Sequence, residues 1–169
     1  HEKEFLDTIT PSAEFTWGLL LTLTRNIIPA NQFVQKGKWD RRPFGGQNML
    51  SRLKIGIVGL GRLGSLVSQY ALAFRMEVFF YDPNIEVCPP RISKCNSLEE
   101  LVSRVDIVSL HVPHERETEG MFSKRIFNSF KKNIHSTAWE GVESYQHKRS
   151  SNSSRFCCRH KKIGSTCKT

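Results

Sequence analysis

The sequence predicts an α/β protein built on a parallel sheet. Three short apolar runs with strand character, at 54–59, 77–81 and 106–110, alternate with stretches of helical spacing. Strands and helices that alternate in this way form βαβ units, because two neighbouring parallel strands need a crossover connection. The first run is apolar after its initial lysine and ends in a glycine, which is typical of a strand buried on both faces.

The element before the sheet is a long helix, expected over 11–36. Pro11 and Ser12 form a start signal, with Ser12 as the N-cap, and apolar residues then recur at helical spacing. Pro29 falls inside this pattern, so we expect it to kink the helix or to divide it in two. Gly37 ends the helix, and a polar connection containing Gly and Pro leads to the first strand.

Three further helices are expected between and after the strands, over 62–74, 97–105 and 121–132. The first has its apolar residues on one side. The second opens with Ser97, which is followed three residues later by Glu100, and this pair is the signature of a capping box.

Composition excludes several classes of protein. The chain has 169 residues, of which 38% are hydrophobic and 24% are charged, and no apolar run approaches the roughly 20 residues that span a bilayer. The N-terminus is charged, lacks the apolar core of a signal peptide and begins with His rather than Met, so we expect a processed chain or a piece of a longer one. The five cysteines form no CxxC pair, so neither a disulfide scaffold nor a metal site is expected, and the expected compartment is the cytoplasm.

Residues 134–169, called the basic tail below, differ in composition from the rest. They hold 7 Lys/Arg, 2 Asp/Glu and no leucine, whereas residues 1–133 hold fourteen leucines. Their net charge of +5 is more than half of the total of +9, so nucleic-acid binding would depend on this tail and is not expected of the body. The tail shows neither a strand nor a helix period. Two explanations stay open, a disordered natural tail or codons read outside their natural frame.

Gly59, Gly61 and Gly64 form a GxGxxG motif in an informative context. A strand precedes it, a helix follows it, and a second strand ends at Asp82, about 20 residues on. The first glycine permits the tight turn, the second lets a pyrophosphate approach the backbone, and the third lets the helix lie close to the sheet. The helix start favours phosphate charge, and the Asp82 carboxylate can accept hydrogen bonds from ribose hydroxyls while repelling a 2′-phosphate. The motif therefore predicts a Rossmann-type domain that binds NAD in preference to NADP.

Together these segments resemble the D-isomer-specific 2-hydroxyacid dehydrogenases, the family that includes D-3-phosphoglycerate dehydrogenase and the glyoxylate/hydroxypyruvate reductases. The resemblance covers residues from about 5 to 133, in the family's order and spacing. The stretches that carry it are TPSAEFTWGLLLTLTR (10–25), GKWDRR (37–42), LKIGIVGLGRLG (53–64), ALAFRMEVFFYDP (71–83), SLEELVSRVDIVSLHVP (97–113) and ETEGMF (117–122). The resemblance implies an enzyme that transfers hydride between NAD and the C2 position of a D-2-hydroxy acid, and a homodimer in the parent enzyme.

By position, the resemblance adds further cofactor contacts. They are Arg62 and Leu63 at the pyrophosphate, Val112 and Pro113 near the nicotinamide, and Thr118 as a weaker candidate. His111 follows the third strand at the same edge of the sheet, where we expect a structural residue rather than an acid or a base.

The chain departs from the family in ways that bear on activity. The family's first half-domain, which carries the loop for the substrate carboxylate, would precede residue 1. Arg75 stands where the family usually has a glycine that ends a helix in a left-handed conformation, which costs a side chain roughly 1 kcal/mol. The catalytic arginine would fall at Trp139, and no stretch in 142–169 matches the motifs of the catalytic glutamate and histidine.

We therefore expect a chain that binds NAD without catalysis, and we assign it no catalytic residue. Residues 1–50 would be a remnant of the substrate domain with its linking helix, 51–133 a partial NAD-binding domain, and 134–169 an unmatched tail. An alternative is a non-catalytic, NAD-sensing interaction protein similar to the family's transcriptional corepressor branch. Because only part of a parallel sheet is expected, we also predict a marginal, aggregation-prone product.

Overall fold

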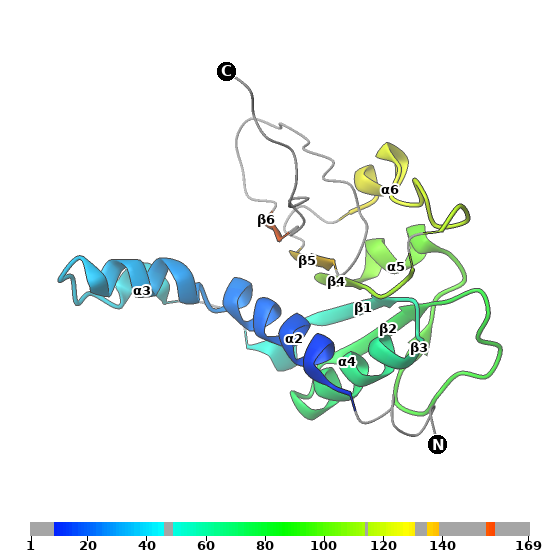
Figure 1. Ribbon diagram of the computed structural model, residues 1–169, viewed down its shortest axis with the longest axis horizontal. Helices are drawn as coiled ribbons and strands as arrows, with labels where there is room; N and C mark the ends of the chain where they lie inside the picture. Colours follow the sequence, from blue (N-terminus) through cyan, green and yellow to red (C-terminus); the bar gives the residue numbers. More distant parts are fainter. Residues whose placement is uncertain (1–8, 46–48, 114, 131–134, 139–154, 158–169) are drawn as a thin grey trace.

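Parallel strands form one sheet at the centre of the protein (Figure 1). The computed structural model describes residues 9–45, 49–113, 115–130, 135–138 and 155–157. Within these residues the sheet has six strands in the order β3-β2-β1-β4-β5-β6, and every neighbouring pair is parallel. The strands are β1 (Lys54–Val58), β2 (Glu77–Tyr81), β3 (Ser93–Lys94), β4 (Ile107–Leu110), β5 (His135–Ala138) and β6 (Arg155–Cys157). The predicted α/β class and parallel sheet are confirmed, and the three expected strands agree with β1, β2 and β4 within one residue.

Three of these strands have no signal in the sequence. β3 has two residues, which is too short to carry a pattern. β5 and β6 lie in the basic tail, whose composition indicates no strand, yet β5 pairs with β4 from Ile107↔His135 to Leu110↔Ala138. A sheet edge offers backbone partners whatever the side chains are, so pairing of this kind leaves no hydrophobic pattern. The rest of the basic tail lies outside the described residues.

Helices cover both faces of the central strands (Figure 1). Alternate residues of a strand point to opposite faces. Ile55 and Ile57 of β1 pack in a cluster with α2 (Pro11–Thr24) and α4 (Arg62–Ala73), whereas Val58 packs in a cluster with α5 (Leu98–Arg104) and α6 (Lys124–Asn128). All four β1 residues after Lys54 are buried. Burial of each large apolar side chain in such a layer contributes about 1.5–3 kcal/mol.

The long helix expected over 11–36 is divided in two, but the break does not lie at Pro29. α2 ends at Thr24, and α3 (Ile27–Gln35) begins after Asn26, which has φ 52° in the left-handed region. Pro29 lies in the first turn of α3. A proline has no N–H for the carbonyl four residues earlier and its ring collides with that carbonyl. That carbonyl belongs to Arg25, so the helical ladder is interrupted there and the chain turns at the next residue.

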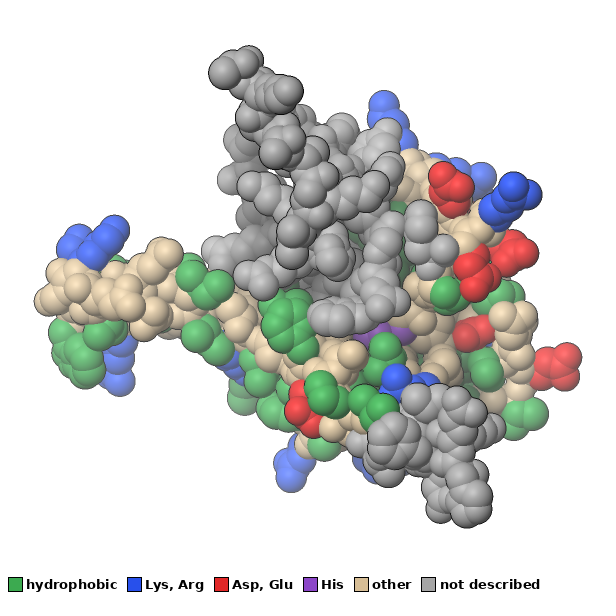
Figure 2. All heavy atoms as spheres, in the orientation of Figure 1, with side chains coloured by type: hydrophobic (Ala, Val, Ile, Leu, Met, Phe, Trp, Pro, Cys, Tyr) green, Lys and Arg blue, Asp and Glu red, His purple; other side chains and the backbone are tan. Residues whose placement is uncertain are grey.

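The α3 segment projects from the body as an arm, defined here as residues 27–45 (Figure 1). No residue of α3 is buried. The arm returns through η1 (Arg42–Phe44), where the rings of Phe33 and Phe44 pack edge to face at 5.4 Å, and η2 (Leu50–Arg52) then leads into β1. Figure 2 shows hydrophobic side chains along the arm and basic ones near its end.

Among the described residues, no helix combines the length and the apolar character that crossing a membrane requires.

Two helices end in the same backbone motif with different residues. After α3, Gly37 has φ +70°, its N–H donates to the Val34 carbonyl, and the next N–H donates to the Phe33 carbonyl. After α4, Arg75 has φ +60°, its N–H donates to the Leu72 carbonyl, and the next N–H donates to the Ala71 carbonyl. Both patterns are Schellman motifs, which favour glycine at the left-handed position. The left-handed conformation expected at Arg75 is therefore present, with a side chain that does not suit it.

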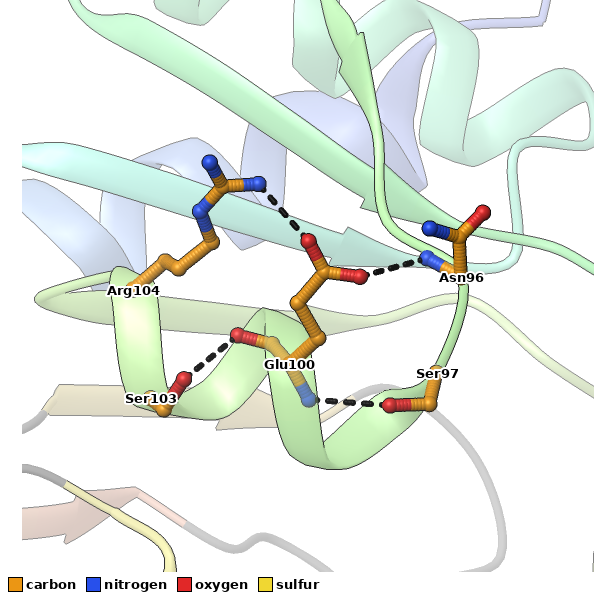
Figure 3. Close-up of polar contacts among 5 residues, drawn as sticks. All are labelled: Asn96, Ser97, Glu100, Ser103 and Arg104. Carbon is orange, nitrogen blue, oxygen red and sulfur yellow. Dashed lines mark hydrogen bonds and ion pairs between the residues drawn. The ribbon is translucent and has the colours of Figure 1, made fainter.

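The capping box at α5 is confirmed, with one displaced bond (Figure 3). Ser97 is the N-cap, and its hydroxyl accepts a hydrogen bond from the Glu100 N–H at 3.1 Å. The Glu100 carboxylate accepts the N–H of Asn96 at 2.8 Å, one residue earlier than the usual box, and pairs with Arg104 at 2.8 Å. These contacts fix the helix that packs against β1 and β2.

The helix expected over 121–132 is shorter than predicted. α6 spans only Lys124–Asn128, with Ser123 as its N-cap. Gly120 has φ +69°, which bends the chain just ahead of it. Phe122, Phe127 and Phe130 pack their rings together at 5.4–6.2 Å, so an aromatic cluster forms around the short helix where a longer helix was expected.

Candidate dinucleotide-binding site

Two glycines in the turn after β1 have no room for a side chain. Gly59 has φ +85°, and a Cβ there would come within 2.8 Å of the His111 carbonyl oxygen and of Val112 Cγ1. A Cβ on Gly64 would lie 2.1 Å from the Gly59 carbonyl oxygen. Both positions face backbone atoms, which cannot yield as the end of a flexible side chain can. The glycines thus let α4 and the end of β4 lie against the turn, as the motif predicts.

Gly61 differs from these two because the space beside it is open. Among the described residues, no atom beyond its chain neighbours and its own helix comes within 4 Å of the position a Cβ would take. Gly61 is the N-cap of α4. The Ser65 N–H is the first in the helical ladder and donates to the Gly61 carbonyl at 2.9 Å, so the N–H groups of Leu63 and Gly64 precede the ladder. An open backbone at a helix start fits the diphosphate of a dinucleotide.

Asp82 follows β2 and reaches the glycine turn. Its Oδ2 accepts the Leu60 N–H at 2.8 Å, and its Oδ1 accepts the Asn84 N–H at 2.9 Å. The carboxylate therefore stands beside the turn with a fixed orientation. Each oxygen has further lone pairs, so the group retains the capacity to accept hydrogen bonds from ribose hydroxyls.

Arg62 and Leu63 occupy the first turn of α4, where the resemblance places pyrophosphate contacts. The Arg62 Nη1 donates to the Ile9 carbonyl at 2.7 Å, which directs the guanidinium toward the segment before α2. Leu63 is partly buried and packs against the cluster of α2 and α4. Both residues lie at the turn, and their backbone N–H groups, rather than these side chains, stand at the open helix start.

Backbone hydrogen bonds join the ends of three strands at this edge. The Gly59 N–H donates to the Tyr81 carbonyl at 3.0 Å, and the His111 N–H donates to the Val58 carbonyl at 2.8 Å. Val112 lies against Gly59, as the space at that glycine shows. The structure thus brings Val112 together with the glycines and with Asp82, which follows β2, and Pro113 follows Val112 in the chain.

Thr118 closes a turn through its side-chain hydroxyl. Its hydroxyl donates to the Pro113 carbonyl at 2.5 Å and accepts the Glu115 N–H at 3.0 Å. These bonds fix the chain between Pro113 and Thr118. Thr118 is thereby tied to Pro113, which the resemblance places near the nicotinamide.

His111 is a neutral, partly unsatisfied side chain at the end of β4. Its Nε2 lies 2.8 Å from Ser109 Oγ, and its buried Nδ1 has no hydrogen-bond partner among the described residues. Burial lowers the pKa of His111 to about 4. The ring is therefore uncharged near pH 7, in agreement with a structural residue.

Two features of the site have little signal in the sequence. Ser109 is fully buried in β4 and contacts His111. The sequence signal for this pair is weak: two polar residues, two positions apart, at the end of an apolar strand. Gly56 lies in β1, and a Cβ there would come within 3.0 Å of Leu101 Cγ. That glycine lets α5 approach the sheet, although it stands outside the GxGxxG motif.

No group of three or more His, Cys, Asp or Glu in the described part of the chain could hold a metal ion.

Comparison with known proteins identifies the domain that carries this turn. The family model for the D-isomer specific 2-hydroxyacid dehydrogenase, NAD binding domain, matches residues 17–135, from α2 to the start of β5. The chain belongs to this family. D-3-phosphoglycerate dehydrogenase of Methanocaldococcus jannaschii is 36% identical over 124 residues, which cover 72% of this chain and 24% of that protein. The chain thus spans about a quarter of the length of the curated relatives it matches.

Solved structures share the fold of this 2-hydroxyacid dehydrogenase domain. D-lactate dehydrogenase of Aquifex aeolicus, complexed with NAD and lactic acid, has a TM-score of 0.67 at 32% identity over 75% of this chain and 38% of that chain. NAD-dependent formate dehydrogenase of Staphylococcus aureus, in complex with NAD, has a TM-score of 0.69 at 30% identity over the same shares. The predicted family and the predicted cofactor, NAD, are confirmed for this domain.

The position expected for the family's catalytic arginine lies just after β5. Ala138 is the last residue of β5 and is level with Leu110 at the end of β4. Trp139, which stands at the expected arginine position, lies outside the described residues, as do His147 and His160 of the basic tail.

Proposed function

We propose that this chain is the cofactor-binding part of an oxidoreductase that transfers hydride between NAD and the C2 position of a D-2-hydroxy acid. 3-Phosphoglycerate and the glyoxylate/hydroxypyruvate pair are the candidate substrates. One observation carries the proposal: Gly61 presents an open backbone at the start of α4, with the Asp82 carboxylate fixed beside it. The cofactor's diphosphate would then be bound at the start of α4, and its ribose by the carboxylate that follows β2.

Each part of the site has a separate task in this proposal. The N–H groups at the start of α4 would bind the diphosphate, and Asp82 would accept the adenosine ribose hydroxyls. Val112 and Pro113 would bound the cleft near the nicotinamide, with Thr118 holding the Pro113 carbonyl in place. NAD, when bound, supplies the hydride acceptor. The chain's own residues bind and orient it.

We propose further that the chain binds NAD without turning over a substrate. Hydride transfer in such an enzyme needs a cation to bind the substrate carboxylate and polarise its carbonyl, and an acid/base group for the proton. Trp139 stands where the resemblance requires that cation, and His111 is neutral with its Nε2 held by Ser109. Neither is suited to the task.

Two titrations on the purified chain test these proposals. NADH fluorescence should rise on addition of the chain, and oxidation of NADH with glyoxylate, hydroxypyruvate or the 2-oxo acid of 3-phosphoglycerate should not exceed the rate without protein. Gly61→Ala places a methyl in the open space and should weaken NADH binding about tenfold. Gly18→Ala, on an α2 position that also has no atom within 4 Å, is the matched control and should bind like the wild type. Turnover would contradict the proposed inactivity, and absence of binding would contradict the proposed function.

A second candidate is a non-catalytic interaction protein that responds to NAD. The arm favours it, because an α3 with no buried residue offers an unpartnered surface. NADH binding without turnover is common to both candidates. A change in the oligomeric state or partner binding on addition of NAD would favour the second.

We also propose that the arm joins two copies of the chain in a homodimer. Ile27, Ile28 and Val34 on α3 are 48–57% exposed, and Figure 2 shows hydrophobic side chains along this arm. Contiguous apolar surface of this kind marks interaction sites. Light scattering should give the mass of a dimer for the wild type and of a monomer for Ile28→Asp. A wild-type monomer would contradict the proposal.

A further inference from the structure

We propose that Asp82 is a positioning residue for the glycine turn as well as the acceptor of the ribose, so that recognition of the sugar and shape of the phosphate site are coupled. This inference rests on the proposed function of the turn. It goes beyond that function because it assigns Asp82 an effect on a part of the ligand that the carboxylate would not touch.

The hydrogen bonds of the turn lead to this assignment. Two backbone groups are held by backbone: the Gly59 N–H by the Tyr81 carbonyl, and the Gly61 carbonyl by the Ser65 N–H. The Leu60 carbonyl accepts the Ser65 hydroxyl at 3.2 Å. The Leu60 N–H, between the two glycines, donates to Asp82 at 2.8 Å. A carboxylate on another strand thus holds the middle of the turn.

The position of Leu60 makes this bond consequential. Leu60 is buried, at 6% exposure, and its neighbours Gly59 and Gly61 are residues with wide backbone freedom. A buried N–H that loses its acceptor is costly, and hydrogen bonds to charged groups are stronger than neutral ones. Without Asp82, the turn would therefore be expected to leave the conformation that presents Gly61 at the helix start.

The two oxygens of Asp82 cannot be replaced by an amide. Oδ2 accepts the Leu60 N–H and Oδ1 accepts the Asn84 N–H, so both sides of the group face donors. An asparagine has one acceptor oxygen and one NH₂, which would leave one N–H facing another donor. Replacing Asp82 to admit a 2′-phosphate would consequently disturb the diphosphate site at the same time.

Binding of two probes to variant chains separates the two roles. ADP carries the ribose diol, and 2′,3′-dideoxy-ADP carries the same diphosphate without it. If Asp82 acts only on the ribose, Asp82→Ala should bind dideoxy-ADP as the wild type does. We expect instead that its affinity for dideoxy-ADP falls about tenfold, the size of one charge-assisted hydrogen bond. Unchanged dideoxy-ADP affinity overturns the inference.

Asp106→Ala is the matched control. Asp106 also accepts a backbone N–H through its carboxylate, that of Lys54 at 2.9 Å, but at the opposite end of β1. It should leave the affinity for both probes unchanged. Equal weakening by both variants would indicate a general loss of structure and would overturn the assignment to Asp82.

Hydrogen exchange gives a second readout. It needs no ligand, and it uses Asp82→Asn, a substitution that keeps the size of the side chain. In Asp82→Asn, the Leu60 or the Asn84 amide should exchange about tenfold faster than in the wild type, while the Gly59 amide, bonded to Tyr81, should not change. Unaltered exchange at both amides overturns the inference even if NAD binds. Failure of the wild type to bind ADP or NAD contradicts the proposed function, whatever the exchange result.

Discussion

The turn after β1 and the turn after β4 lie against each other at the carboxyl edge of the sheet, but they are held differently. The first is fixed by two glycines that face backbone atoms, Gly59 and Gly64, and by the Asp82 carboxylate, which accepts the Leu60 N–H. The second is closed by the Thr118 hydroxyl, which donates to the Pro113 carbonyl, and His111 Nδ1 there remains unsatisfied among the described residues. The proposed NAD contacts at the first turn thus lie within residues 54–82, whereas the second turn is tied to Thr118, later in the chain.

The largest expected effect breaks the first turn. Gly64→Ala places a Cβ 2.1 Å from the Gly59 carbonyl oxygen, so either α4 or the turn must move. Urea unfolding followed by circular dichroism should show a loss of about 3 kcal/mol in the free energy of unfolding. Gly18→Ala, in open space on α2, should raise stability by about 0.5–1 kcal/mol. Equal stability of Gly64→Ala and the wild type would contradict the close approach of α4.

A smaller effect concerns the second turn and pH. Burial lowers the pKa of His111 to about 4 in the folded chain, whereas an unfolded histidine titrates near 6.5. The unfolded state therefore binds a proton first as pH falls. The contribution of His111 is complete above about pH 6.5 and is lost between there and about pH 4.

The measurement is the free energy of unfolding at pH 7 and at pH 5, for the wild type and for His111→Asn. The wild type should lose about 2 kcal/mol more than the variant over this interval, because only it carries the buried imidazole. The other histidines and the carboxylates titrate in both chains and cancel in the difference. Equal losses would show that the imidazole is solvated.

The contrast between the turns also explains what could be predicted from the sequence. The glycines and Asp82 were predictable because a tight strand-to-helix turn tolerates few residue types, and their spacing reports the geometry directly. The bond from Asp82 to Leu60 was not, since an acidic residue at this position suggests a ribose and gives no sign of a backbone partner. The pairing of Ser109 with His111 leaves only an ordinary polar residue in an apolar strand.

The helices and strands also differ in how well the sequence predicts them. β1, β2 and β4 are buried on both faces, so their apolar runs identify them, and α4 follows from helical spacing. The break after α2 lies three to four residues before the expected one, because Pro29 affects the carbonyl of Arg25 rather than its own position. β5 and β6 pair through backbone at the edge of the sheet, where side chains carry no pattern.

The smallest expected effect concerns Arg75, which stands at the end of α4 in a backbone conformation that favours glycine. Arg75 has φ +60° in a Schellman motif, where the equivalent residue after α3 is Gly37. Arg75→Gly should raise the free energy of unfolding by about 1 kcal/mol, because glycine adopts this conformation without a Cβ penalty. Arg75→Ala keeps the penalty and should not stabilise the chain. Equal gains from both substitutions would assign the effect to loss of the arginine side chain.

The most direct test of the NAD site at the glycine turn is a map of backbone amide shifts during titration with NAD. We expect the shifts to concentrate at Gly61, Leu63 and Gly64, with smaller shifts at Leu60 and Asn84, whose amides are bonded to Asp82. The amide of Gly37 provides an internal control, since it lies in a comparable helix-end motif on the arm and should not move. Shifts confined to other segments, or no shifts at saturating NAD, would contradict the assignment of the turn as the cofactor site.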